Sequence, residues 1–216
     1  MSDTVQLIFE IIGTIAFSIS GAMIGVRKEM DIFGVVILGL TTAVGGGIIR
    51  DIILGITPPN TFQNPIYAVI AIITAIIVFL PIVQNIFAKH PQYSEKIMLL
   101  MDSVGLGIFT VVGIQTAYSI TDQYNLFLLI FVGVVTGVGG GVMRDVMAGD
   151  RPYIFVKHFY ATASLIGALV CGALWLYMGQ GLSMTLGTVV VVVLRLCAAK
   201  FRWSLPKGKR INKQKT

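Results

Sequence analysis

The chain has 216 residues, of which 56% are apolar and only 12% are charged. Ordinary soluble domains carry about 25% charged residues, so this composition excludes a typical water-soluble fold and indicates an integral membrane protein. The formal net charge of +6 comes from a basic C-terminal segment, which we expect to lie against anionic lipid. That segment lacks interleaved aromatic residues beyond Phe201 and Trp203, so no nucleic-acid partner is predicted.

Apolar runs of about 20 residues, long enough to cross a bilayer as helices, recur between short charged segments. They predict an all-α integral membrane fold with a basic cytoplasmic tail at 202–216. The first run lacks a preceding basic segment and a following cleavage site, which disfavours a removable signal peptide. The seven predicted transmembrane helices are 4–26, 33–54, 65–87, 97–119, 125–148, 158–179 and 183–201.

Lysine and arginine occur in alternate connecting segments. The connections after the first, third and fifth predicted helices carry two each, and the C-terminal end carries seven from Lys200 onward. The N-terminal stub and the other three connections carry none. Because short cytoplasmic loops retain basic residues, the N-terminus is predicted to lie outside and the C-terminus in the cytoplasm. The compact chain is expected in a bacterial inner membrane.

Residues 39–58 and 133–152 are two copies of one element. At a shift of 94 residues, ten of the twenty aligned positions are identical, including Gly-Gly-Gly-x-x-Arg-Asp-x-x-x-Gly. Each copy lies in the second helix of a three-helix unit, at 4–87 and 97–179. Because three is odd, the second unit enters the membrane from the opposite side, as in inverted-repeat transporters. The seventh helix, 183–201, is expected to pack outside the repeats or to help an oligomer form.

The glycine triplets are costly in a helix, at about 1 kcal/mol per residue relative to alanine. One interpretation is close packing of neighbouring helices. The other is a kink or a short unwound stretch that turns backbone groups toward a cavity. The triplets are Gly45, Gly46 and Gly47 in the first repeat and Gly139, Gly140 and Gly141 in the second.

Four ionisable side chains lie inside the second and fifth predicted helices: Arg50, Asp51, Arg144 and Asp145. Such residues usually face the bundle interior or a water-filled cavity. The inverted arrangement puts Arg50 toward the outer mouth of a pathway and Arg144 toward the inner mouth. Alternatively, each arginine satisfies backbone carbonyls or pairs with an aspartate across the interface without touching solute.

Two acids near the starts of the first and fourth helices, Glu10 and Asp102, lie close together in the repeat alignment. They are expected either to be partners of the arginines or to be interfacial charges. Arg195 is expected to reach the inner interface by snorkelling, and Cys171 and Cys197 to be small core residues. No catalytic, phosphate-binding or metal-ligand spacing is present, so no enzymatic activity, cofactor or metal is predicted.

The pattern of three, three and one helices, with Gly-Gly-Gly-x-x-Arg-Asp in the second and fifth, resembles the prokaryotic trimeric intracellular cation (TRIC) channels. Their repeat unit is also known as a glycine-transporter domain. The resemblance covers about residues 5 to 200. It implies a homotrimer in which each subunit has its own pore for monovalent cations such as potassium, lined by glycine-kinked second and fifth helices. The triplets would then be hinges, with Arg50 and Arg144 beside the pore.

An arginine in a narrow pore repels cations unless Asp51, Asp145 or another acid neutralises it. A secondary transporter of glycine or another small amino acid is therefore the alternative. Arginine would bind the carboxylate of such a solute, and an aspartate or carbonyl groups would bind its ammonium. A membrane scaffold that transports nothing is the third possibility.

Overall fold

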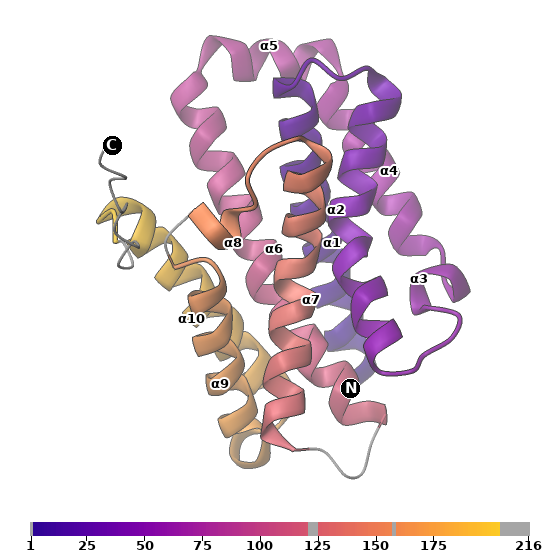
Figure 1. The fold of residues 1–216 in the computed structure, drawn as a ribbon, viewed down its shortest axis with the longest axis vertical. Coiled ribbons are helices and arrows are strands. Elements are labelled where there is room, and N and C mark those ends of the chain that lie inside the picture. Colours follow the sequence, from indigo (N-terminus) through magenta and orange to yellow (C-terminus); the bar gives the residue numbers. More distant parts are fainter. Residues whose placement is uncertain (1, 121–124, 157–158, 204–216) are drawn as a thin grey trace, which may run out of the picture.

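The computed structural model describes residues 2–120, 125–156 and 159–203, and the described elements are all helical. The predicted basic tail therefore lies outside the described residues from residue 204 onward. The helices, shown in Figure 1, are α1 (Ser2–Arg27), α2 (Ile32–Ile53), α3 (Asn60–Gln63), α4 (Ile66–Phe79), α5 (Pro81–Lys89), α6 (Pro91–Ile120), α7 (Leu126–Met147), α8 (Tyr153–Val156), α9 (Ala161–Met178) and α10 (Gln180–Lys200).

Six of the described helices are long and apolar enough to cross a membrane, namely α1, α2, α6, α7, α9 and α10. The third predicted helix, 65–87, is not one straight span, because α4 and α5 meet at a 60° bend. Pro81 is the first residue of α5, and its ring and missing N–H prevent α4 from continuing. At about 1.5 Å per residue, the 14-residue α4 spans only about 21 Å. With α4 and α5 counted as one crossing, the chain passes the membrane seven times.

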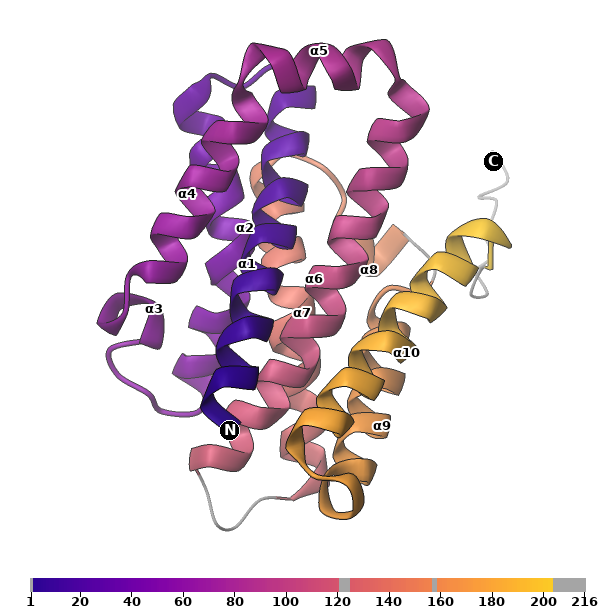
Figure 2. The same ribbon diagram turned by 180° about the vertical axis from the view of Figure 1, so that it is seen from behind.

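The helices form two three-helix units and one extra helix. The first unit contains α1, α2 and α4, and the second contains α6, α7 and α9. The units meet along α2 and α7 and along α1 and α6, while α10 packs on the outside against α9 and α6. Figure 2 shows α10 on the outer side of the second unit and α5 lying across the end of the bundle. The position of α10 outside the repeats is the one expected from the sequence.

The contact between α2 and α7 is reciprocal. A Cβ atom added at Gly46 would overlap the backbone oxygen of Thr136, and one added at Gly140 would overlap that of Thr42. The repeat shift of 94 residues carries Gly46 onto Gly140 and Thr42 onto Thr136. The two backbones therefore cross around a pseudo-two-fold axis, as inverted repeats require.

The contact between α1 and α6 obeys the same symmetry. The rings of Phe17 and Phe109 lie 5.2 Å apart between centroids. A Cβ atom at Gly105 would overlap the ring of Phe17, and one at Gly13 would lie 3.2 Å from the ring of Phe109. A shift of 92 residues relates both pairs, so the first helices of the two units are offset by two residues from the alignment of the glycine motifs.

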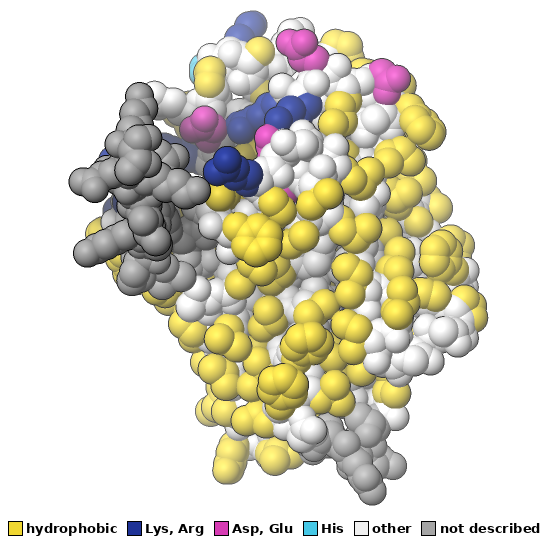
Figure 3. Space-filling view, viewed as in Figure 1, with side chains coloured by type: hydrophobic (Ala, Val, Ile, Leu, Met, Phe, Trp, Pro, Cys, Tyr) yellow, Lys and Arg dark blue, Asp and Glu magenta, His cyan; other side chains and the backbone are white. Residues whose placement is uncertain are grey.

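The two ends of the bundle differ in charge. The α1–α2 turn with Arg27 and Lys28, the start of α6 with Lys96, and the α7–α8 connection with Arg151 lie at one end, which we call the basic end. The α2–α3 connection lies toward the opposite end, which we call the N-terminal end (Figure 1). Figure 3 shows lysine and arginine gathered near the basic end, above a face that is mostly apolar. The alternation of basic connections seen in the sequence thus corresponds to two ends of one bundle.

Candidate functional site

Each Arg-Asp motif lies in or next to the last turn of its helix, where the negative end of the helix dipole favours a cation. Helix α2 stops because Gly55 has a φ of 74°, and α7 stops because Gly149 has a φ of 72°. The chain then turns back and starts a short helix. Asp51 accepts a hydrogen bond from the first backbone N–H of that helix, at 2.7 Å, and Asp145 does the same in the second repeat.

Within each motif the arginine binds its own neighbour. The distance from Arg50 Nε to Asp51 Oδ1 is 2.8 Å, and that from Arg144 Nε to Asp145 Oδ1 is 2.9 Å. All four side chains are buried. The aspartates therefore join the arginine to the start of the following short helix. The arginine of each motif pairs with its own neighbour, whereas the sequence had suggested an aspartate across the interface.

A second acid completes the cluster at the basic end. Asp102 Oδ1 lies 2.5 Å from Arg144 Nη1, so Asp102 is a partner of the arginine, as one of the two expectations held. Arg144 also donates to Ser20 Oγ at 2.6 Å. The guanidinium group lies 4.9 Å from the centre of the Tyr153 ring. Arg144 is fully buried and Asp102 is 1% exposed, so this cluster is held by ionic contacts inside the bundle.

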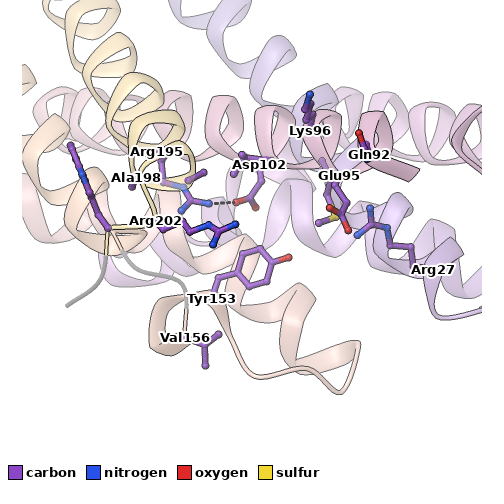
Figure 4. A pocket seen from close by; sticks show the side chains of 14 residues that line it. Arg27, Gln92, Glu95, Lys96, Asp102, Tyr153, Val156, Arg195, Ala198 and Arg202 are labelled. Atoms are coloured by element: carbon purple, nitrogen blue, oxygen red, sulfur yellow. Dashed lines mark hydrogen bonds and ion pairs between the residues drawn. The ribbon is translucent and has the colours of Figure 1, made fainter. Parts of the chain in front are cut away.

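The expectation for Arg195 was wrong. Arg195 is 2% exposed, and its Nη2 lies 3.4 Å from Asp102 Oδ2, as the dashed line in Figure 4 marks. Its guanidinium also lies 4.8 Å from the centre of the Tyr160 ring. Because a buried carboxylate faces it, Arg195 turns into the bundle and does not snorkel to the interface. The seventh helix thus contributes to the cluster at the basic end.

The corresponding cluster at the N-terminal end is arranged differently. Glu10 accepts hydrogen bonds from the hydroxyl of Tyr67 and from Gln6 Nε2, the latter at 3.0 Å. Glu10 and Arg50 line the same cavity, but in the part of the chain that the structure describes no cation lies within 4.0 Å of Glu10. The structure therefore brings Glu10 and Arg50 together without pairing them.

Several members of these clusters were not found from the sequence. Asn60 and Tyr67 correspond to Tyr153 and Tyr160 at a shift of 93 residues. Extending the repeat alignment beyond the glycine motif would have identified Tyr67 and Tyr160 as an equivalent pair. Arg195 has no counterpart in the repeats, so only its position inside an apolar span gave a signal.

A cavity opens at each end of the bundle. The larger, of about 770 Å³, lies at the basic end and is lined by Arg27, Lys96, Asp102, Arg195 and Arg202, among others. Figure 4 shows these side chains around the opening, together with Tyr153 from α8. The smaller, of about 40 Å³, lies at the N-terminal cluster. The two cavities thus lie at opposite ends of the bundle, and charged side chains line part of each.

The cavities are separated by the centre of the bundle. Phe109 lines the smaller cavity and Asp102 lines the larger one, and both belong to α6. Seven residues of helix separate them, or about 10 Å. Phe17, which is 1% exposed, packs on Phe109 between them. We call Phe17 and Phe109 the phenylalanine pair.

The glycine triplets do not unwind their helices. Both α2 and α7 are continuous α-helix through the triplets, so the expected short unwound stretch is absent from these residues. Gly45 faces Met143, Gly47 lines the smaller cavity, and Gly141 faces the hydroxyl of Tyr160. Gly139 lies against Gly46 at the crossing described above. Close packing is therefore one role of the triplets, and a hinge role stays a prediction.

The chain is similar to known membrane proteins along most of its length. The family profile described as glycine transporter matches residues 7–81 and 99–176. The UPF0126 inner membrane protein YadS of Escherichia coli (strain K12) is 35% identical over 200 residues, which cover 91% of this chain and 93% of YadS.

Solved structures show the same likeness. The TRIC trimeric intracellular cation channel orthologue from Rhodobacter sphaeroides is 33% identical, with a TM-score of 0.82 over 93% of this chain and 100% of that chain. A prokaryotic TRIC channel crystallised in 0.5 M KCl is 34% identical, with a TM-score of 0.84 over 94% of this chain and 99% of the other. The protein is a multi-pass protein of the inner or plasma membrane. Two glycine-transporter repeats with inverted topology, together with these similarities, show that the chain belongs to the prokaryotic TRIC channel family.

Proposed function

We propose that the protein is a channel for monovalent cations, potassium first among them, with a pathway inside each subunit. The observation that carries the proposal is the pair of cavities on opposite ends of one bundle. The smaller is lined by Arg50, and the larger is lined by Asp102, which pairs with the buried Arg144. The structural likeness to TRIC cation channels over more than nine tenths of the chain supports it. The pathway would run along α2 and α7, with Arg50 beside its outer mouth and Arg144 beside its inner mouth.

The described conformation corresponds to a closed channel in this proposal. The phenylalanine pair and the crossing of Gly46 with Gly140 occupy the centre between the cavities. An apolar constriction of this kind stops ions because it excludes the water that must accompany them. Opening would require α1 and α6 to move apart at the phenylalanine pair, with the glycine triplets as the sites where α2 and α7 adjust.

We further propose a homotrimer with the N-terminus outside and the C-terminus in the cytoplasm. The trimeric relative from Rhodobacter sphaeroides supports the assembly. The gathering of basic residues at one end supports the orientation, because basic loops remain on the cytoplasmic side.

A carrier of a small zwitterion is a second candidate, since Arg50 and Glu10 line one cavity and could bind a carboxylate and an ammonium group. The size of that cavity weighs against it. At 10–15 Å³ for each water, about 40 Å³ holds roughly three water molecules, fewer than the five heavy atoms of glycine. The channel is therefore the better-supported function.

The test is electrical recording of purified protein in a planar bilayer under a potassium gradient. We expect resolvable unitary currents, because a carrier turns over far too slowly to produce them. Phe109→Ala should raise the open probability by removing half of the phenylalanine pair. Phe62→Ala, at a side chain that is 66% exposed on α3, should behave as wild type. Silence of the wild type together with glycine uptake into proteoliposomes would reverse the assignment.

A further inference from the structure

The two ionic clusters correspond by symmetry but differ in charge. A shift of 92 residues carries Glu10 onto Asp102, and the shift of 94 residues that relates the glycine motifs carries Arg50 onto Arg144. At the basic end, Arg144 and Arg195 face Asp102 and Asp145, so the charges balance. At the N-terminal end, one arginine faces two carboxylates. These three groups therefore carry one negative charge in excess, and Glu10 and Arg50 are the two of them that line the cavity.

The single arginine at the N-terminal end is committed to the other acid. Arg50 binds Asp51 Oδ1 through both Nε and Nη2, each at 2.8 Å. Asp51 itself is fully buried, whereas Glu10 is partly exposed and lines the cavity. The second arginine of the basic end comes from α10, which has no copy in the first repeat. The excess charge at the N-terminal end thus belongs to Glu10.

Glu10 is held in place as an acceptor. The hydroxyl of Tyr67 donates to one carboxylate oxygen and Gln6 donates to the other. Both groups donate to the carboxylate, whose oxygens have further lone pairs that can accept from another ligand. Thr14 and Tyr67 line the same cavity, and each has a neutral hydroxyl oxygen.

We infer that Glu10, with Thr14 and Tyr67, forms a monovalent-cation site at the N-terminal mouth of the pathway. The inference rests on the proposed channel function and assigns its cation preference to one residue. Carboxylates at a pore mouth attract cations, and a site of one carboxylate and neutral oxygens binds weakly enough to release them. A divalent ion requires more ligands, and the described residues contain no cluster of three acids, histidines or cysteines. Arg50, close by, weakens binding further.

Substitution of Glu10 by glutamine tests the site, because it removes the charge and keeps the size. In bilayers with a potassium chloride gradient, Glu10→Gln should shift the reversal potential toward zero and lower the unitary conductance. The loss should be on the order of fivefold at about 10 mM salt and less than about twofold at 1 M, because the Debye length falls from about 30 Å to about 3 Å. A structural defect would not depend on salt in this way.

Three comparisons complete the experiment. Glu10→Asp restores the charge and should restore most of the cation preference. Tyr67→Phe removes a neutral oxygen of the site and the donor to Glu10, so it should weaken the preference less than Glu10→Gln does, because the carboxylate remains. Glu29→Gln makes the same charge change on an exposed residue at the basic end and should leave the unitary conductance at low salt unchanged.

If the wild type conducts and Glu10→Gln matches its conductance at low salt, the inference about Glu10 is wrong and the proposed channel function stands. If the wild type does not conduct, the proposed channel function and the cation site at Glu10 are both wrong. Elution of Glu10→Gln at the wild-type position in size exclusion shows that it is folded.

Discussion

Arg144 is a fully buried cation inside a membrane protein, and its surroundings account for that position. Asp145 binds its Nε at 2.9 Å and Asp102 binds its Nη1 at 2.5 Å. Two carboxylates, the hydroxyl of Ser20 and the Tyr153 ring thus replace part of the water that the guanidinium loses. Asp102 is shared with Arg195, so the basic-end cluster joins α6, α7 and α10 by charge. Removal of any member leaves another charge buried.

Arg144→Ala should lower the free energy of unfolding by about 3–5 kcal/mol, because it leaves a buried carboxylate without its cation. Asp102 would keep Arg195, so the orphan is Asp145, which retains only the backbone N–H of Tyr153. Adding Asp145→Asn to Arg144→Ala should recover more than about 1 kcal/mol, which is within the range for contacting residues. Reversible unfolding in mixed micelles measures the free energy of unfolding of the wild type, the two single variants and the double variant. Simple additivity of the two substitutions would contradict the pairing.

At the scale of helices, two neighbouring glycines of one triplet have different surroundings. Gly46 lies at the crossing with α7, where no side chain fits between the backbones. Gly47, its neighbour, has only the guanidinium of Arg50 at 3.8 Å from an added Cβ atom. Helix propensity alone treats the two glycines alike. Their contacts with the second repeat make only Gly46 necessary for packing.

Gly46→Ala should therefore destabilise the protein by about 1–3 kcal/mol, since the overlap is with the backbone oxygen of Thr136 and cannot be relieved by a rotamer change. Gly47→Ala, the matched control, should be neutral or stabilising by up to about 1 kcal/mol, because alanine favours the helix. Thermal unfolding in detergent measures both. Equal midpoints for the two variants would show that the helices do not approach as closely as the structure indicates.

At the scale of the whole molecule, the repeats place equivalent residues on opposite ends of the bundle. Thr57 follows the first glycine motif near the N-terminal end, and Arg151 follows the second near the basic end (Figure 1). Both are exposed. In a cell, one would contact the periplasm and the other the cytoplasm.

Cysteine labelling tests this arrangement. In a background with Cys171 and Cys197 replaced by serine, Thr57→Cys should react with a membrane-impermeant maleimide in intact spheroplasts. Arg151→Cys should react only after the membrane is opened. Labelling of both from the same side would contradict the inverted repeats. Labelling of Arg151→Cys alone in intact spheroplasts would keep the repeats and reverse the proposed orientation.

Much of the fold could be predicted from local sequence, since spanning helices need apolar runs of set length and the glycine motif occurs twice. Those two features also predicted the inverted repeats, gave the outer position of α10 as one of two possibilities, and turned the Arg-Asp pairs toward protein or water. They did not predict the bend at Pro81 or the approach of Gly46 to Gly140. A helix break can be overlooked in a uniformly apolar segment, and a packing contact depends on the partner helix.

The partners of the charged side chains were decided only by the tertiary structure. Arg195 follows the rules for a snorkelling residue until Asp102, 93 positions earlier, is brought to 3.4 Å from it. Glu10 and Asp102 occupy equivalent positions, yet Asp102 contacts two arginines, whereas Glu10 contacts a tyrosine and a glutamine. Periodicity and repeats are local properties and can be read from the chain. The field at a buried charge is summed over helices from all parts of the sequence, so it exists only once they have packed.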